Sequence, residues 1–68
     1  MKQKLEKYIN YELNNIKNWG SDPNQVCTRC YGAVMFVTNF YCNPEEGDEI
    51  AKWWNDEIHP KFRELGAY

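Results

Sequence analysis

Apolar residues recur along the first part of the chain at intervals of three and four, the spacing that places side chains on one face of an α-helix. These residues are Leu5, Tyr8, Ile9, Leu13, Ile16 and Trp19. Gly20 favours the left-handed backbone that ends helices, and the following Ser21-Asp22-Pro23 is typical of a connector. The pattern therefore predicts a first helix over about residues 2–19.

The next stretch predicts a long apolar middle helix over about residues 23–42, with Asp22 as its cap and Pro23 in its first turn. One apolar face comprises Val26, Cys30, Ala33, Val37 and Phe40 or Tyr41. A nearly opposite apolar face comprises Tyr31, Met35, Thr38 and Cys42. The polar stripe between them is narrow and consists of Gln25, Thr28, Gly32 and Asn39. Two neighbouring helices of so short a chain cover part of this surface, so we expect a second protein surface to cover the rest.

An alternative for residues 31–41 is a β-strand, because this segment is rich in β-branched and aromatic residues. The chain offers no second candidate strand, so such a strand would have to pair with another molecule. The helix is the favoured interpretation.

A third helix is predicted over about residues 45–65, started by Asn43 or Asp48. The apolar residues on its predicted inner face are Ile50, Trp53, Trp54, Ile58 and Leu65. Pro60 removes a backbone donor and disfavours a helical His59, so a kink or short break is expected there. The sequence thus predicts a single all-α domain over residues 1–68, a small three-helix bundle.

Eleven aromatic residues, namely three Trp, five Tyr and three Phe, are more than the core of a 68-residue chain can hide. Aromatic side chains are also favoured where proteins meet. The residues predicted to form an interface are Tyr31, Met35, Thr38, Cys42 and Trp53. The leading hypothesis is a non-catalytic interaction or structural module, a homodimer or a small accessory subunit bound to a larger protein.

The formal net charge of −2 gives no field that attracts polyanions, so a nucleic-acid-associated regulator is a weaker alternative. The N-terminal residues lack the apolar run of a secretory signal, and the longest uncharged stretch, from Cys30 to Asn43, is too short to span a bilayer. We therefore expect a cytoplasmic protein without membrane contact. In that compartment the three cysteines are expected to be free thiols.

Cys27-Thr28-Arg29-Cys30 has the C-x-x-C spacing of metal and redox sites, with Cys42 and His59 as further candidate ligands. In a helix, Cys42 lies about 18 Å beyond Cys30, too far for one tetrahedral zinc. We predict neither metal nor other cofactor, with Cys27 and Cys30 packed as small apolar residues and His59 facing solvent. A metal site on Cys27 and Cys30, with ligands from elsewhere, is the alternative.

Two carboxylates, Glu12 and Glu57, fall within the apolar stripes of the first and third predicted helices. A buried carboxylate needs a partner, and Arg29 on the middle helix is the candidate. Glu12 and Glu57, together with Cys27 and Cys30, define the alternative of a small acid–base or metal site. We expect no enzymatic activity, because no spacing in the chain matches a catalytic motif.

Overall fold

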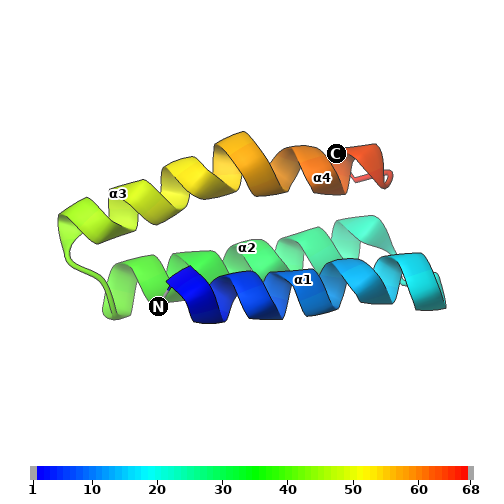
Figure 1. The fold of residues 1–68 in the computed structure, drawn as a ribbon, viewed down its shortest axis with the longest axis horizontal. Coiled ribbons are helices and arrows are strands. Elements are labelled where there is room, and N and C mark those ends of the chain that lie inside the picture. The colour runs from blue at the N-terminus through cyan, green and yellow to red at the C-terminus, as the bar shows by residue number, and fades with distance from the viewer. Residues whose placement is uncertain (1, 68) are drawn as a thin grey trace.

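The computed structural model describes residues 2–67 and consists of three antiparallel helical segments (Figure 1). The first is α1, Lys2–Trp19, and the second is α2, Pro23–Phe40. The third contains α3, Pro44–Trp53, a π-helical turn η1, Trp54–Ile58, and α4, His59–Glu64. The predicted all-α three-helix bundle is confirmed, and residues 31–40 are helical. Within the described residues, every helix is too short or too polar to cross a membrane.

The turn residues act as the sequence indicates. Gly20 adopts a φ of 70°, and the Asp22 side chain accepts a hydrogen bond of 3.0 Å from the Asn24 N–H. Asn43 caps α3 by accepting a bond of 2.8 Å from the Glu46 N–H. Proline disfavours the helical region for the residue before it, and Asn43 before Pro44 is extended, with φ −74° and ψ 168°. The middle helix therefore ends at Phe40 rather than at residue 42, and the third begins at Pro44 rather than at residue 45.

The core is built from small apolar side chains on α2 and larger ones on the other segments. Its buried members are Leu5, Ile9, Leu13, Ile16, Val26, Cys30, Val34, Val37, Ile50, Trp53, Trp54, Ile58 and Phe62. Close packing of α2 against α3 also depends on Gly47, where a Cβ would lie 3.3 Å from the Thr38 carbonyl oxygen. Phe40 and Tyr41, expected on the packing face of α2, are instead exposed.

The expected kink near Pro60 is replaced by the wide turn η1. The His59 N–H bonds to the carbonyl of Trp54, five residues earlier, and His59 keeps a helical backbone with φ −55° and ψ −42°. The expectation of a non-helical His59 is therefore wrong. A proline ring clashes with the carbonyl four residues before it, and the extra residue in a π-helical turn gives that ring room without breaking the helix.

The same extra residue changes which side chains face the core. On a regular helix Glu57 would lie between Trp53 and Trp54 on the apolar side, but η1 delays the rotation by about one residue. Phe62 consequently faces inward together with Ile58, which was expected there, and Glu57 is exposed. The prediction that Glu57 lies in the apolar stripe is thus wrong, and Phe62, which the sequence pattern did not select, is fully buried.

Candidate functional site

Glu12 is the buried charged group of the described core, only 4% exposed at the contact of α1 with α2. Its carboxylate accepts hydrogen bonds from the Tyr8 hydroxyl at 3.1 Å and from Asn15 Nδ2 at 3.3 Å. Arg29 Nε donates a third bond and forms an ion pair with the same carboxylate. Burial of Glu12 and its pairing with Arg29 agree with the sequence prediction.

This environment keeps Glu12 ionised. Burial disfavours the charged carboxylate, but the hydrogen bonds from Arg29, Tyr8 and Asn15 outweigh it, so the pKa of Glu12 lies below its ordinary value. A general acid at neutral pH needs the opposite shift. Glu57 lies elsewhere, on η1 near Lys2 and Trp53. The two carboxylates therefore do not form the predicted pair, and Glu12 with Arg29 joins two helices.

The cysteines also lack the features of a reactive or metal-binding site. Burial, followed by the nearby Glu12 charge, raises the pKa of the fully buried Cys30 to about 12. Burial likewise raises the pKa of Cys27. Both thiols therefore stay protonated at neutral pH, whereas metal binding and nucleophilic attack require the thiolate. Residues 2–67 contain no group of three His, Cys, Asp or Glu side chains placed to hold a metal ion.

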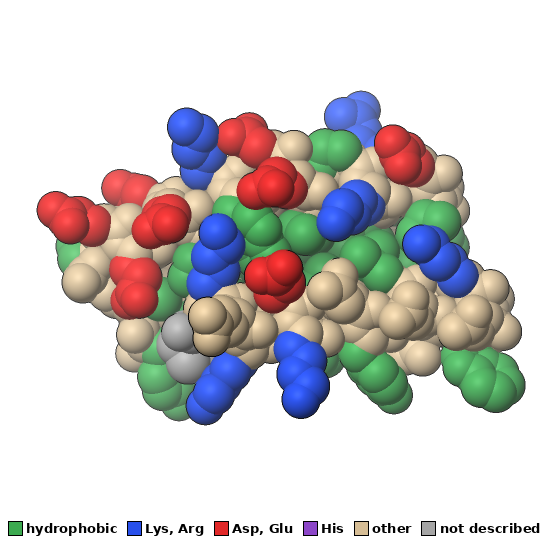
Figure 2. Space-filling view, viewed as in Figure 1, with side chains coloured by type: hydrophobic (Ala, Val, Ile, Leu, Met, Phe, Trp, Pro, Cys, Tyr) green, Lys and Arg blue, Asp and Glu red, His purple; other side chains and the backbone are tan. Residues whose placement is uncertain are grey.

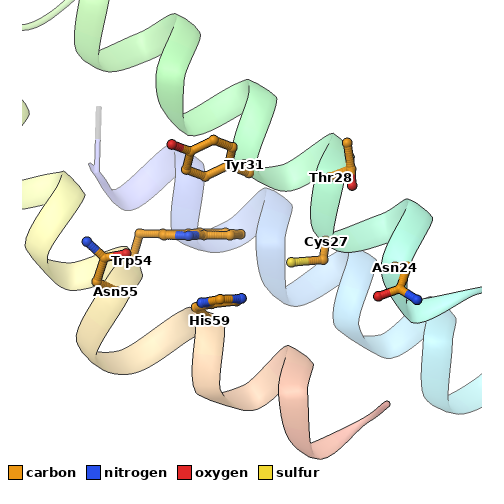
Figure 3. Close-up of a pocket in the computed structure, with 7 residues that line it drawn as sticks. All are labelled: Asn24, Cys27, Thr28, Tyr31, Trp54, Asn55 and His59. Atoms are coloured by element: carbon orange, nitrogen blue, oxygen red, sulfur yellow. The ribbon is translucent and has the colours of Figure 1, made fainter. Parts of the chain in front are cut away.

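A cleft of about 330 Å³ lies between the first half of α2 and the junction of η1 with α4 (Figure 3). Its lining residues are Asn24, Cys27, Thr28, Tyr31, Trp54, Asn55 and His59. Trp54 lies between two rings, with centroids 5.7 Å from Tyr31 and 6.2 Å from His59. His59 is stacked on Trp54 and half-buried, which corrects the expectation that it faces solvent. Tyr31 and His59 thus contact the two faces of Trp54, and the Cys27 thiol is protonated. The residues that line the cleft therefore stabilise the junction of α2 with η1.

The most unusual surface belongs to α2 and the residue after it. Five large apolar side chains there are between 41% and 73% exposed, and we call this set the α2 aromatic face. Its members are Tyr31, Met35, Phe36, Phe40 and Tyr41. Three of its rings contact one another, since the Phe36 centroid lies 5.2 Å from that of Phe40 and 5.5 Å from that of Tyr41.

The surroundings of this face are free of charge along the sequence from Cys30 to Asn43. The opposite situation is seen over α1 and the third segment in Figure 2, where acidic side chains gather at the start of α3 and Lys and Arg side chains flank the apolar band. An uncharged aromatic surface beside charged ones is typical of a protein contact.

The predicted interface residues divide into two groups. Tyr31 and Met35 are exposed as expected. Thr38 lies at the contact with α3, and Cys42 packs against the core. Trp53 is buried, with the Lys2 ammonium 5.4 Å from its ring centroid. Thr38 and Cys42 are thus half-buried, and Trp53 belongs to the core.

Sequence reasoning missed Phe36 and placed Phe40 and Tyr41 on the inner face. The signal that could have found all three is the run without charge, in which bulky aromatics alternate with Val34 and Val37. The inner positions go to the smaller residues, because Trp53, Trp54 and Phe62 of the third segment fill the space opposite them.

A second feature of α2 is an open hollow of about 490 Å³ at its N-terminal half, lined by Asn24, Gln25, Thr28 and Arg29. Between this hollow and the rings lies Gly32, where an added Cβ would meet no atom within 4 Å.

No family model, curated protein or solved structure matches this chain. The fold and surface by themselves thus define a small all-α protein whose described residues expose five large apolar side chains on and just after α2 and two, Tyr11 and Trp19, on α1.

Proposed function

We propose that this protein is a non-catalytic interaction module that binds another protein surface through the α2 aromatic face. The observation that carries the proposal is the exposure of five large apolar side chains within eleven residues that contain no charge. Scattered apolar residues are normal on protein surfaces, whereas a cluster of exposed rings in mutual contact, as Phe36, Phe40 and Tyr41 form here, is typical of a contact site.

The size of the face supports this role. Aromatic side chains present about 150–250 Å² each, so exposures of 41–73% leave on the order of 500 Å² of apolar surface open on this face. A chain of this length also has a small core, and association is one of the usual means of stabilising such a domain. Binding through α2 would therefore cover surface that the chain itself leaves in water.

Other roles have less support from the same residues. The raised pKa values of Cys27 and Cys30 keep both thiols protonated, which disfavours metal binding, and the lowered pKa of Glu12 disfavours a role as general acid. A cytoplasmic location remains part of the proposal, and a reducing compartment would keep the three cysteines as free thiols.

Site-specific photo-crosslinking tests the proposal. A benzophenone amino acid replaces Phe40, which is 73% exposed, in the intact chain, and the matched control replaces Tyr11, an aromatic residue on α1 that is 62% exposed. In the cells that produce the protein, we expect position 40 to form a discrete protein adduct and position 11 to form little or none. Absence of an adduct at position 40, or equal adducts at both positions, would contradict the proposed function.

A further inference from the structure

The cleft between α2 and the junction of η1 with α4 is formed where small side chains meet large ones (Figure 3). On α2 the lining positions are 24, 27, 28 and 31, which recur at intervals of three and four and therefore share one side of the helix. The first three of these positions hold small residues, Asn24, Cys27 and Thr28. Because these side chains do not reach across to η1, a space of about 330 Å³ stays open between the two segments.

The opposite wall of the cleft depends on the π-helical turn η1. Trp54 begins this turn, and the His59 N–H bonds to the Trp54 carbonyl five residues earlier. On a regular helix two residues five apart project in directions about 140° apart. The wider turn brings the two side chains to one side, where their rings stack with planes 10° apart. Such turns are rare in proteins and occur frequently at functional sites, so η1 is a second indication that this cleft has a role.

The lining of the cleft is aromatic and polar but carries no Asp, Glu, Lys or Arg among the described residues. Three other hollows of the described chain each include at least one such residue. Tyr31 is 48% exposed, so part of its ring is open toward solvent. The side-chain hydrogen bonds within residues 2–67 leave the hydroxyls of Thr28 and Tyr31 and the Asn55 amide unused. The cleft thus combines ring surfaces with a few uncharged hydrogen-bonding groups, as ligand sites do.

We propose that this cleft binds a small, uncharged aromatic compound whose ring carries a hydrogen-bonding group such as a primary amide. Its volume lies at the lower end of the range for ligand sites, about 300–1,000 Å³. A planar ring packs against the open part of Tyr31 and the edge of Trp54, and its polar group bonds to Thr28 or Asn55. A charged compound is disfavoured, because it would lose water without meeting an opposite charge.

This inference goes beyond the proposed function, because Phe36, Phe40 and Tyr41 take no part in the cleft. Photo-crosslinking at position 40 and ligand binding in the cleft therefore report on different residues. A protein that crosslinks at position 40 but binds no aromatic compound refutes the cleft proposal alone. A protein that binds the compound but forms no adduct at position 40 refutes the interaction module alone.

Titration with nicotinamide, followed in ¹H–¹⁵N NMR spectra of the intact protein, tests the ligand class. We expect saturable shifts at the backbone amides of residues 27, 28, 55 and 59, with a dissociation constant of roughly 1–10 mM for so small a compound. The amides of residues 10 and 14, at exposed positions of α1, should not shift. Nicotinate has the same ring with a negative charge, and cyclohexanecarboxamide has the same amide on a puckered ring. Both should bind at least tenfold more weakly.

The outcomes of this titration are distinct. No shift at the cleft residues with 50 mM nicotinamide would overturn the proposal. Equal binding of the three compounds would also overturn it, because the cleft would then be a nonspecific apolar contact. Shifts spread evenly over the chain would have the same meaning.

Filling the cleft tests its location. Thr28→Trp places a large ring at an exposed lining position, so helicity should persist while nicotinamide binding is lost. The matched control Asn39→Trp adds the same ring to an exposed position of α2 outside the cleft and should bind like the parent. Thr28→Val keeps the shape of the side chain but removes its hydroxyl, and it should weaken binding about threefold to tenfold. Unchanged binding in Thr28→Trp would contradict the proposal.

Cysteine protection tests the same site in the unaltered protein. The Cys27 sulfur points toward the rings of Trp54 and His59 (Figure 3), so a bound compound should cover it. Nicotinamide at ten times its dissociation constant should slow iodoacetamide modification of Cys27 about tenfold, because only the unbound protein reacts. Cys42 is also half-buried but lies outside the cleft, and its rate should not change. No protection of Cys27, or equal protection of both thiols, would overturn the proposal.

Discussion

Replacing either member of the ion pair between Glu12 and Arg29 should have unequal effects, because the Glu12 side chain is 6% exposed and the Arg29 side chain 56%. Arg29→Met leaves a buried charge with the longer hydrogen bonds from Tyr8 and Asn15. Glu12→Met removes the buried charge and frees an arginine that water already reaches. Loss of a partner leaves the desolvation penalty of the group that remains buried, whereas an apolar replacement of that group is nearly neutral.

The expected magnitudes follow from these exposures. Breaking a fully buried pair costs about 3–5 kcal/mol, and partial exposure of Arg29 reduces this to about 2 kcal/mol for Arg29→Met. Glu12→Met should cost less than about 1 kcal/mol, and the double variant should resemble it. Since a domain of this size is stable by only about 3–5 kcal/mol, the difference is readily measured by urea unfolding monitored by circular dichroism.

The pH dependence gives the same comparison a second readout. In the parent protein the pKa of Glu12 is lowered, so its contribution to stability is present above the ordinary value of 4.5 and is lost as the pH falls through the folded-state pKa. In Arg29→Met, burial is less opposed, so the pKa should rise and protonation should relieve the penalty. The free-energy gap between the two proteins should therefore narrow from pH 7 to about pH 3.5. A gap that is constant with pH, or a Glu12→Met protein less stable than Arg29→Met, would refute the reasoning.

Three further outcomes are expected. Phe62→Ala should cost about 3–5 kcal/mol and abolish cooperative thermal unfolding near room temperature, whereas Trp19→Ala at an 81% exposed site should shift the midpoint little. Iodoacetamide should modify Cys30 last among the cysteines, because it is fully buried and its pKa is about 12, and mass spectrometry of native protein should show this order. Deleting Asn55 removes the extra residue of η1, so the fold should survive by circular dichroism when Pro60→Ala is also present and fail when Pro60 is retained.

The helices could be predicted from the sequence because their start and stop signals are local. Asp22-Pro23, Gly20 and Asn43-Pro44 act within one turn of backbone, and each lies where the sequence indicates. The positions beyond Trp54 could not be assigned to a face in the same way. A periodicity of 3.6 residues assumes a regular helix, and one π-helical turn changes the register of every later residue, including Glu57 and Phe62.

The exposure of large aromatic side chains could be predicted from the sequence, but not which of them are exposed. An excess of aromatic residues indicates contact with a partner, but it does not say which rings the core retains. Which rings are buried depends on the volumes of the side chains that meet where two helices pack together. The third segment supplies Trp53, Trp54 and Phe62, so α2 can pack against them only with smaller side chains.

This division of volume also explains why the aromatic face exists. Val34 and Val37 fit beneath the tryptophans, whereas an inward Phe36 or Phe40 would overfill a core that already contains three large rings. The register shift at η1 brings Phe62 inward and thereby completes that set. The π-helical turn and the exposed rings of α2 are thus connected: the turn directs Phe62 of the third segment into the core with Trp53 and Trp54, and the rings of α2 remain exposed.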